Sequence, residues 1–250
     1  MANNGVKFLA VLLMMGVGAG VASADATNVR PIALGNSALQ DVFDDLYVSG
    51  PGIDAEASQI SGALFENQAS GGAVATFIIE LAGFASTNRF GIYSAGDPSN
   101  KAEVFDGADG AGDQAIISFM ANGDIKVNFV TVATGFGDRF GFYLDVYGGD
   151  DTLDETFYSE DSLNGGDAQA LIYQGDDATE LQLPGFAPGT FSGDEVIVAF
   201  EDVVLGRSDA DYDDLVVLVE SVTPVPAPGA ALLAVLGMPV VGWVRRRRSA

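Results

Sequence analysis

The chain has 250 residues, of which 35 are acidic and 11 are basic, so its formal net charge is −24. It contains no cysteine and no histidine, which excludes disulfides, thiol nucleophiles, imidazole-ligated zinc and any Ser–His catalytic pair. So acidic a chain has too few Lys and Arg to neutralise phosphates, and no nucleic-acid partner is expected. Glycine contributes 32 residues and the hydrophobic content is 48%, which together indicate a folded, turn-rich protein.

The segment 1–24 has the organisation of a secretory signal peptide. Lys7 provides a positive flank, and an apolar stretch over 8–17 follows it. Ala22 and Ala24 are small residues at the positions that signal peptidase reads, so we expect export, with cleavage after Ala24. A retained anchor helix is the alternative interpretation.

One amphipathic helix is predicted soon after this leader. Ser37 and Gln40 fit a capping box at its start. The apolar residues that follow the i, i+3, i+4, i+7 spacing of one helical face are Leu39, Val42, Phe43 and Leu46.

Beyond this helix, short apolar runs alternate with Gly, Asp and Asn, a pattern typical of β-strands joined by turns. The predicted strands are Val74–Leu81, Arg89–Tyr93, Glu103–Phe105, Ala115–Met120, Ile125–Val130, Phe140–Val146, Ala170–Tyr173, Val196–Phe200 and Leu215–Val222. In the fifth of these, Ile125, Val127 and Phe129 alternate with polar residues, which indicates one solvent-facing side. The pattern predicts an all-β fold: an antiparallel β-sandwich or jelly-roll-like body with one short N-terminal helix, plus a C-terminal transmembrane helix.

A weak internal repeat links two of the predicted strands. The segment 89–93 reads RFGIY and the segment 139–143 reads RFGFY, and each is preceded by a Gly-Phe pair. A turn rich in Gly and Asp follows each copy. The repeat can mark two equivalent hairpins, the halves of a duplicated sandwich, or a chance recurrence.

The densest acidic segment follows the predicted strand Val196–Phe200. Carboxylates about 6 Å apart repel by roughly 1–3 kcal/mol per pair, and Arg207 can neutralise only one of them. Because Ca²⁺ prefers several carboxylate and carbonyl oxygens on a flexible loop, we predict a calcium site in which alternate aspartates converge on the ion. The candidate ligands are Glu201, Asp202, Asp209, Asp211, Asp213 and Asp214.

A merely solvated acidic loop is the alternative to a calcium site. An EF-hand that begins at Asp209 is rejected, because its sixth position is Asp214 instead of Gly and the segment 215–219 has the pattern of a strand. Two further acidic groups can be cation sites or plain turns. They are Asp106, Asp109 and Asp113, and Asp150, Asp151, Asp154 and Glu155.

The segment 224–250 has the organisation of a sorting tail. Pro224, Pro226 and Pro228 form an extended spacer, and the uncharged stretch 225–244 is roughly 30 Å long as a helix, enough to span a bilayer. A following cluster of arginines is expected to stay on the cytoplasmic side. These features predict an exported body held transiently in the inner membrane by its C-terminal helix. A buried terminal helix is the alternative.

Together the parts of this tail resemble the PEP-CTERM sorting signal of exported proteins in Gram-negative bacteria. The matching residues are Val225, Pro226, Ala227 and Pro228, then the apolar stretch, then Arg245, Arg246, Arg247 and Arg248. The family has Glu where this chain has Ala227. The resemblance implies recognition by an exosortase-like membrane protease-transpeptidase, and release or attachment of the body outside the cell.

The segment 140–223 resembles a domain of unknown function that is common in exported bacterial proteins. The matching sequences are FGFYL at 140–144, FYSEDSLN at 157–164, FED at 200–202 and DADYDDLV at 209–216. The resemblance implies no catalytic activity and makes the acidic loop a shared feature. We therefore divide the chain into a signal peptide (1–24), a β-rich part (25–139), this domain (140–223) and the sorting tail (224–250).

These observations predict a non-enzymatic protein of the cell surface or extracellular matrix, stabilised by calcium and in contact with extracellular polysaccharide. A secreted carbohydrate-binding module is the main alternative, with Tyr143, Tyr147, Tyr158 and Tyr173 as candidate sugar-stacking residues. A carboxylate-based glycoside hydrolase is a further alternative, although abundant acids do not by themselves define a catalytic pair.

Overall fold

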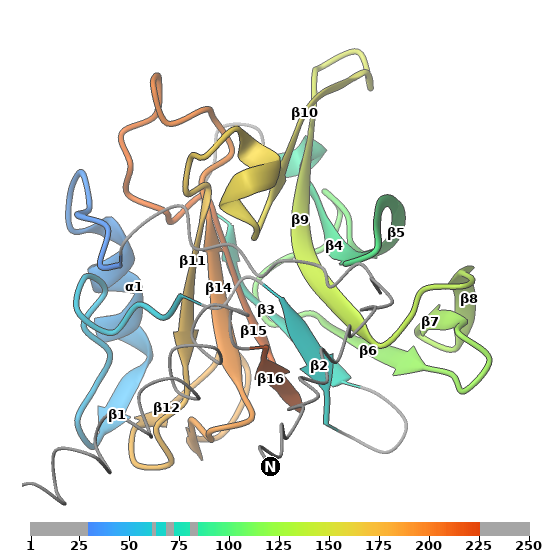
Figure 1. Ribbon diagram of the computed structural model, residues 1–250. Helices are drawn as coiled ribbons and strands as arrows, with labels where there is room; N and C mark the ends of the chain where they lie inside the picture. Colours follow the sequence, from blue (N-terminus) through green and yellow to red (C-terminus); the bar gives the residue numbers. More distant parts are fainter. Residues whose placement is uncertain (1–29, 62–63, 69–72, 81–84, 226–250) are drawn as a thin grey trace, which may run out of the picture.

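The computed structural model describes residues 30–61, 64–68, 73–80 and 85–225 (Figure 1). The predicted signal peptide with Ala22 and Ala24 lies outside these residues, and so do Pro226, Ala227, Pro228 and the arginine cluster 245–248. Within the described ranges, no helix is long and apolar enough to cross a membrane.

The described residues form an all-β fold with one α-helix, α1 (Ala38–Leu46), and two short 3-10 helices, η1 (Ala85–Thr87) and η2 (Asp161–Asn164). The strands are β1 (Tyr47–Ser49), β2 (Phe65–Asn67), β3 (Ala73–Glu80), β4 (Arg89–Ser94), β5 (Asp97–Phe105), β6 (Gln114–Phe119), β7 (Ile125–Val127), β8 (Val130–Ala133), β9 (Arg139–Tyr147), β10 (Leu153–Tyr158), β11 (Ala170–Gln174), β12 (Glu180–Leu181), β13 (Gly189–Thr190), β14 (Val196–Phe200), β15 (Leu215–Val219) and β16 (Val222–Pro224). Each predicted strand overlaps one of these, and the all-β prediction is confirmed.

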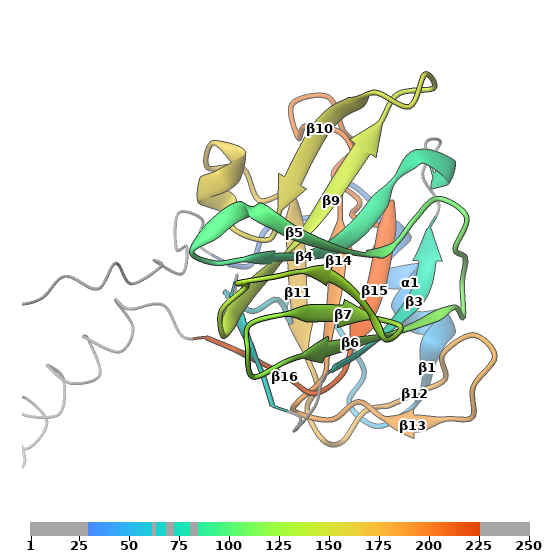
Figure 2. The same cartoon turned by 90° about the vertical axis from the view of Figure 1, so that its right-hand side faces the viewer.

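The strands form two large antiparallel sheets and one small sheet (Figures 1 and 2). The seven-stranded sheet has the order β11-β14-β15-β3-β6-β7-β8. The six-stranded sheet has the order β16-β2-β9-β4-β5, with β10 also paired to β9. Strands β1, β12 and β13 form the small sheet.

The two large sheets enclose the main hydrophobic core. Phe142 of β9 lies among other aromatic rings, with its centroid 4.8 Å from that of Phe65 and 5.7 Å from that of Phe90. Phe90 in turn meets Phe200 of the seven-stranded sheet edge to face at 6.2 Å. All four side chains are buried, and such burial of apolar surface, worth about 25 cal/mol per Å², holds the sandwich together.

Helix α1 covers the other face of the seven-stranded sheet, and the four predicted residues of its apolar face are all buried. Along β14, Val198 and Phe200 face the main core, whereas Ile197 and Ala199 belong to the cluster beneath the helix. Since the middle of this sheet is buried on both sides, the β14 sequence is a continuous apolar run instead of an alternating one.

The predicted capping box of α1 is wrong. Ser37 makes no side-chain hydrogen bond at the helix start, and its φ and ψ of −98° and 7° are not those of an extended cap residue. Asn36 takes this role, because its Oδ1 accepts a hydrogen bond from the Ala38 N–H at 2.6 Å. The Gln40 amide instead donates to the Ile53 carbonyl at 3.0 Å, which ties the helix to the next loop.

The predicted strand Ile125–Val130 is broken by a turn. Asn128 and Phe129 have positive φ values of 49° and 70°, as in a type I′ hairpin turn, and they connect β7 to β8. Phe129 is therefore 76% exposed and does not continue the alternation of Ile125 and Val127.

The predicted strand Leu215–Val222 also divides in two. β15 ends at Val219, Ser221 has a positive φ of 60°, and the chain then crosses to the other large sheet as β16. Pro224, which the sequence assigns to the predicted sorting tail, lies in β16, where a proline is tolerated because β16 is an edge strand. The Val225 N–H donates to the Leu64 carbonyl at 2.7 Å, so the folded part includes the first residue of the predicted sorting motif.

The two repeated segments are neighbouring antiparallel strands. In the pairing of β4 with β9, Gly91 lies opposite Tyr143 and Tyr93 lies opposite Gly141. Each glycine leaves room for the opposing ring, because a Cβ at either position would clash with it. The repeat therefore corresponds to two equivalent hairpins, β4–β5 and β9–β10, joined through their first strands.

The segments on either side of residue 140 share both large sheets. β9, which begins at Arg139, pairs with β4, and β15 pairs with β3. In the described residues, the predicted parts 25–139 and 140–223 are therefore interleaved in one sandwich.

Candidate metal centre

The loop 201–214 joins β14 to β15 and carries all six predicted metal ligands. The two strands are antiparallel, with Phe200 opposite Leu215, so both ends of the loop leave the sheet at the same edge. The Asp202 N–H consequently donates to Asp214 Oδ2 at 2.9 Å, although the two residues lie at opposite ends of the loop.

Five of the six predicted carboxylates come together in two overlapping groups. The first group is Glu201, Asp209 and Asp211, and the second is Asp211, Asp213 and Asp214. Within each group, one oxygen from every residue lies within 4.8 Å of the others. A Ca²⁺ ion with oxygen ligands at about 2.3–2.6 Å fits between oxygens at this spacing. The three alternate aspartates do not share one group, since Asp209 and Asp213 each meet Asp211 separately.

Asp202 is the predicted ligand that belongs to neither group. It is buried, and its Oδ2 accepts a hydrogen bond from the Asn88 side chain at 3.0 Å. Its N–H donates to Asp214 Oδ2, so Asp202 contacts a member of the second group through its backbone.

Burial leaves two oxygens of the first group without a partner. Glu201 is 0% exposed and Asp211 is 7% exposed, yet Glu201 Oε2 and Asp211 Oδ1 make no hydrogen bond. Their other oxygens are satisfied, because Glu201 Oε1 accepts from the Tyr212 N–H at 2.8 Å and Asp211 Oδ2 from the Asn36 side chain at 2.9 Å. A buried polar atom without a partner costs about 1–3 kcal/mol, and more when it is charged.

No basic side chain compensates these carboxylates in the part of the chain that the structure describes. Arg207, which the sequence offers as a counter-charge, is exposed and makes no ion pair there. Arg30 is buried, but its ion pair is with Asp161 at 3.3 Å. The cluster therefore has no described basic partner, and all its members except the exposed Asp209 are buried or half-buried.

The pKa values of the cluster respond to this environment. Burial raises the pKa of Glu201, and the charges of Asp211 and Asp209 add to the effect. Burial, then the hydrogen bond and charge of Asp211, raise the pKa of Asp213 to about 7. Burial, with the charges of Asp202 and Glu201, raises the pKa of Asp214 to about 8. Each shift means that the folded protein resists placing a further negative charge here.

The backbone between the alternate aspartates is left-handed. Ala210 and Tyr212 have φ values of 58° and 57°, an uncommon conformation for residues other than glycine. The Ala210 carbonyl accepts a hydrogen bond from the Gly35 N–H at 2.7 Å, and a Cβ on Gly35 would clash with the Asp209 carbonyl. The segment before α1 is therefore packed directly against the acidic loop.

Sequence reasoning missed three residues that hold the site: Gly35, Asn36 and Asn88. None has a local signal, because each reaches the loop from a distant part of the chain. Asn36 is 175 residues from Asp211, and Asn88 is 114 residues from Asp202.

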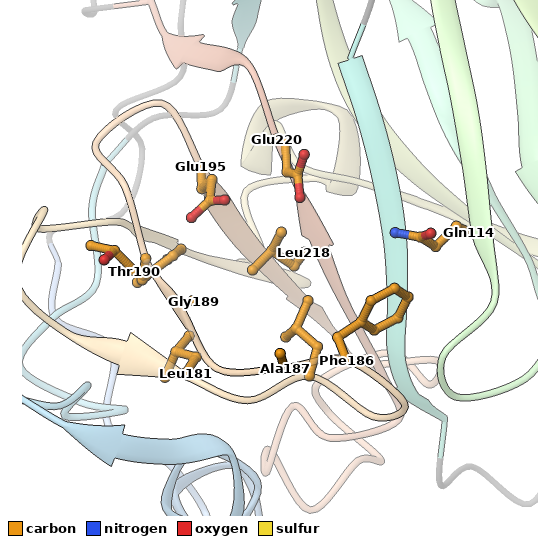
Figure 3. A pocket seen from close by; sticks show the side chains of 11 residues that line it. Gln114, Leu181, Phe186, Ala187, Gly189, Thr190, Glu195, Leu218 and Glu220 are labelled. Atoms are coloured by element: carbon orange, nitrogen blue, oxygen red, sulfur yellow. The ribbon is translucent and has the colours of Figure 1, made fainter.

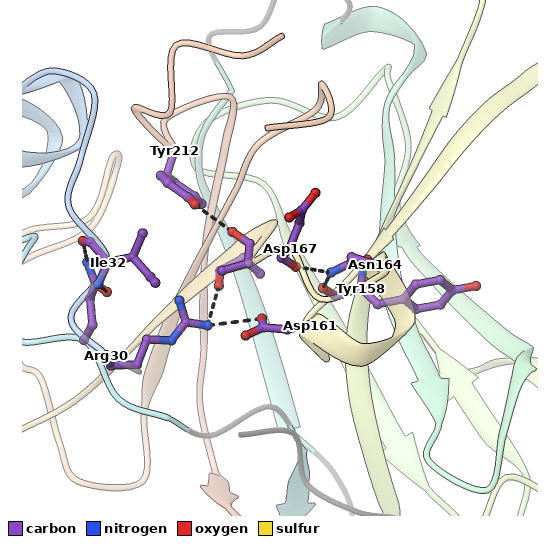
Figure 4. Close-up of polar contacts among 10 residues, drawn as sticks. Arg30, Ile32, Tyr158, Asp161, Asn164, Asp167 and Tyr212 are labelled. Atoms are coloured by element: carbon purple, nitrogen blue, oxygen red, sulfur yellow. Dashed lines mark hydrogen bonds and ion pairs between the residues drawn. The ribbon is translucent and has the colours of Figure 1, made fainter. Parts of the chain in front are cut away.

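A second polar network connects the loop 201–214 to the segment 161–170 (Figure 4). The Tyr212 hydroxyl donates to the Ala168 carbonyl at 2.7 Å, and Arg30 reaches both Asp161 and the Ala170 carbonyl. The buried ring of Tyr212 therefore fixes the middle of the acidic loop to the segment that precedes β11.

The motif segment 157–164 has a structural role. Asn164 binds both backbone groups of Tyr158, accepting from its N–H at 2.9 Å and donating to its carbonyl at 2.8 Å (Figure 4). The Ser159 hydroxyl accepts a hydrogen bond from the Phe142 N–H at 3.0 Å. These contacts fasten η2 to β9 and β10.

The other acidic residues lie mostly in turns, except for Asp154 and Glu155, which lie in β10. In the segment 106–113, the aspartate side chains accept hydrogen bonds from backbone N–H groups of the same segment, for example Asp109 from Asp106 at 2.8 Å and Asp113 from Gly110 at 2.8 Å. Asp150 likewise accepts from Thr152 at 3.2 Å, and Asp151 pairs with Arg89 at 3.1 Å. Neither segment contributes to a group with metal-ligand spacing among the residues described.

The tyrosines considered as sugar-stacking residues do not form an exposed row. Tyr143 and Tyr173 are buried, at 2% and 1% exposure. Tyr147 is covered by the Arg89 guanidinium at 4.3 Å, and Tyr158 packs edge to face against Tyr93 at 5.1 Å.

A separate pocket of about 200 Å³ lies where the β12–β13 segment meets the seven-stranded sheet (Figure 3). Leu181, Phe186 and Leu218 supply its apolar wall, and Glu195 and Glu220 line it as well. The pocket is smaller than the roughly 300–1,000 Å³ of most small-molecule sites, so we do not take it as the functional site.

The two glutamates of this pocket oppose each other across a strand pair, since they flank the register pair Val196–Val219 (Figure 3). Burial raises the pKa of Glu195, and the Glu220 charge adds to it. Burial, followed by the Asp194 charge, raises the pKa of Glu220. Like charges that face each other across strands are destabilising.

Replacing Glu220 with Gln should therefore stabilise the protein at pH 7, by about 0.2–1 kcal/mol, the scale of cross-strand charge pairs. A raised carboxyl pKa gives stability that is present at low pH and is lost as the pH rises above the ordinary value of 4.5. The gain from E220Q should consequently vanish at pH 4. Thermal unfolding at the two pH values measures both effects, with the exposed Glu56→Gln as the control. A gain of equal size at pH 4 would show that charge is not the cause.

Comparison with family models, with curated proteins and with solved structures found no match for this chain.

Proposed function

We propose that this chain is a non-enzymatic exported protein of the cell surface or extracellular matrix, whose β-sandwich is stabilised by calcium bound in the loop 201–214. The observation that carries the calcium proposal is the pair of buried, unpartnered oxygens, Glu201 Oε2 and Asp211 Oδ1, within a group of carboxylates. All-oxygen ligand sets favour Ca²⁺ over softer metals, and the chain has no Cys or His to offer.

Export is supported by the leader-like segment 1–24 and by the PEP-CTERM-like tail. β16 is an edge strand that ends at Pro224, and the Pro-Ala-Pro motif follows within two residues. This arrangement suits processing by an exosortase-like enzyme after transient anchoring in the inner membrane. Calcium sites of extracellular modules function with dissociation constants of about 10⁻⁴–10⁻³ M, so even a weak site suffices outside the cell.

Acidic extracellular polysaccharide is the partner that fits this chemistry. A protein with a net charge of −24 repels polyanions unless a cation lies between them. Asp209 is the exposed member of the first group, so an ion held there has a side that faces solvent. We propose that calcium at this position links the protein to carboxylate or sulfate groups of the polysaccharide.

Intact-mass measurement of the mature protein from its native host tests the export proposal. The expected species begins at Asp25 and lacks Arg245–Arg248, and it fractionates with the cell surface or the medium. A variant in which Pro226 and Pro228 are replaced by Ala should retain the arginine cluster and stay in the membrane fraction. An untrimmed wild-type chain found dissolved in the cytosol would overturn the proposal.

A further inference from the structure

We propose that the loop 201–214 holds two calcium ions, bridged by Asp211. The inference rests on the proposed calcium function and assigns the number of ions and their ligands. One ion would sit among Glu201, Asp209 and Asp211, and the other among Asp211, Asp213 and Asp214.

The spacing of the carboxylates argues for two positions. Ligand oxygens on opposite sides of one Ca²⁺ are at most about 5 Å apart, since each lies 2.3–2.6 Å from the ion. In each group of three, the ligand oxygens lie within 4.8 Å of one another, which is inside this limit, and the five residues form two such groups that share Asp211. A single ion therefore reaches only one group in this geometry.

Asp211 is suited to bridging. It is the residue common to both groups, and it is 7% exposed. The Asn36 side chain fixes its Oδ2 at 2.9 Å, while Oδ1 is buried and has no hydrogen-bond partner. Two metal ions that share a site typically lie about 3.5–4 Å apart, which one carboxylate can span.

Glu201 provides an independent indication of a ligand in the first group. Its side chain is 0% exposed, Oε1 is held by the Tyr212 N–H, and Oε2 is left without a partner. A buried carboxylate oxygen without a hydrogen-bond partner is stabilised by protonation or by a cation. Asp211, whose Oδ1 also has no partner, belongs to the same group as Glu201, so one cation there would have ligands from both residues.

The charge balance favours two ions over one. The five ligands carry five negative charges when ionised, and no described basic residue forms an ion pair with any of them. One Ca²⁺ would leave three charges uncompensated within a few ångströms, whereas two would leave one.

The test is calorimetric titration of the purified protein with CaCl₂, supported by native mass spectrometry to count bound ions. Wild type should bind two ions. Asp209→Asn removes a ligand of the first group only, and Asp213→Asn removes a ligand of the second group only. Each variant should therefore bind one ion. The ion that remains in one variant should differ in affinity from the ion that remains in the other. Asp211→Asn should weaken both by at least about tenfold.

The turn variant Asp109→Asn, at a half-buried residue outside both groups, is the matched control and should bind two ions. A melting transition in chelator verifies that each variant folds. If Asp211→Asn does not fold, the Asp209 and Asp213 variants still decide the test. Wild type binding one ion, lost equally in both single-group variants, would overturn the two-ion inference while leaving the calcium function intact. Wild type binding none would overturn both.

Discussion

Removal of calcium with a chelator, starting from protein in about 10 mM calcium, should lower the melting temperature of the purified protein by roughly 5–11 °C. For a site with a dissociation constant of about 10⁻⁴ M, calcium is then present at about 100 times that constant and stabilises the folded state by about 2.7 kcal/mol. For a domain of 150–250 residues, each kcal/mol corresponds to about 2–4 °C. The physical source is the neutralisation of buried carboxylates, of which Glu201 and Asp211 have oxygens without any other partner.

The variant Glu201→Gln separates this effect from ordinary packing, because its sign should depend on calcium. In chelator, E201Q should melt above wild type, since it removes a buried charge while its carbonyl still accepts the Tyr212 N–H. In millimolar calcium, E201Q should melt below wild type, because a ligand of the first group is lost. Differential scanning calorimetry under both conditions measures the reversal.

Glu56→Gln is the matched control, since Glu56 is exposed and lies outside both groups. It should change stability by less than about 0.5 kcal/mol in either condition. If E201Q melts below wild type in chelator as well as in calcium, Glu201 has a packing role and the calcium proposal fails at its central residue. If chelator leaves the wild-type melting temperature unchanged, the loop is a solvated or protonated acidic cluster.

The position of the acidic loop could be predicted from the sequence because the two strands that flank it are easily recognised. Strands β14 and β15 are continuous apolar runs that are easily recognised, and a pairing of Phe200 with Leu215 brings the intervening acids together. The division of these acids into two groups could not be predicted. Between these acids, Ala210 and Tyr212 are left-handed and contact Gly35 and the Ala168 carbonyl, both distant in sequence, and no local pattern indicates either feature.

The helix shows the same limit. Its buried face follows from periodicity and was predicted residue by residue, whereas its first turn was not. Asn36 displaced Ser37 from the capping role because one side chain both accepts the Ala38 N–H and donates to Asp211. A capping motif depends on neighbouring residues only, whereas here the tertiary hydrogen bond of Asn36 to Asp211 favours Asn36 over Ser37 as the capping residue.

The repeat is a case in which the sequence signal was real but its meaning required the fold. Two copies of Arg-Phe-Gly-x-Tyr are compatible with separate halves of a sandwich. In the structure the two copies pair with each other, so the glycine of each copy lies opposite the tyrosine of the other. The second prediction with a large expected effect tests this glycine–tyrosine packing.

Replacing Gly141 with Ala should lower the free energy of unfolding by about 1–3 kcal/mol, the usual cost of overpacking a core. The added Cβ would clash with the hydroxyl and ring of Tyr93. Tyr93 cannot move aside, because it is 0% exposed, its hydroxyl donates to Glu160 at 2.8 Å, and its ring meets Tyr158 edge to face at 5.1 Å. Urea denaturation measures the loss.

Gly149→Ala is the matched control in the turn of the same hairpin, where an added Cβ meets nothing within 4 Å, and it should be neutral within about 0.5 kcal/mol. A double-mutant cycle with Tyr93→Leu then isolates the contact. Without the tyrosine ring, the additional cost of Gly141→Ala should fall to a few tenths of a kcal/mol, since contacting residues are energetically coupled and separated ones are not. An unchanged cost in the Tyr93→Leu background would mean that glycine is required by the backbone of β9 and that the two copies of the repeat do not depend on each other.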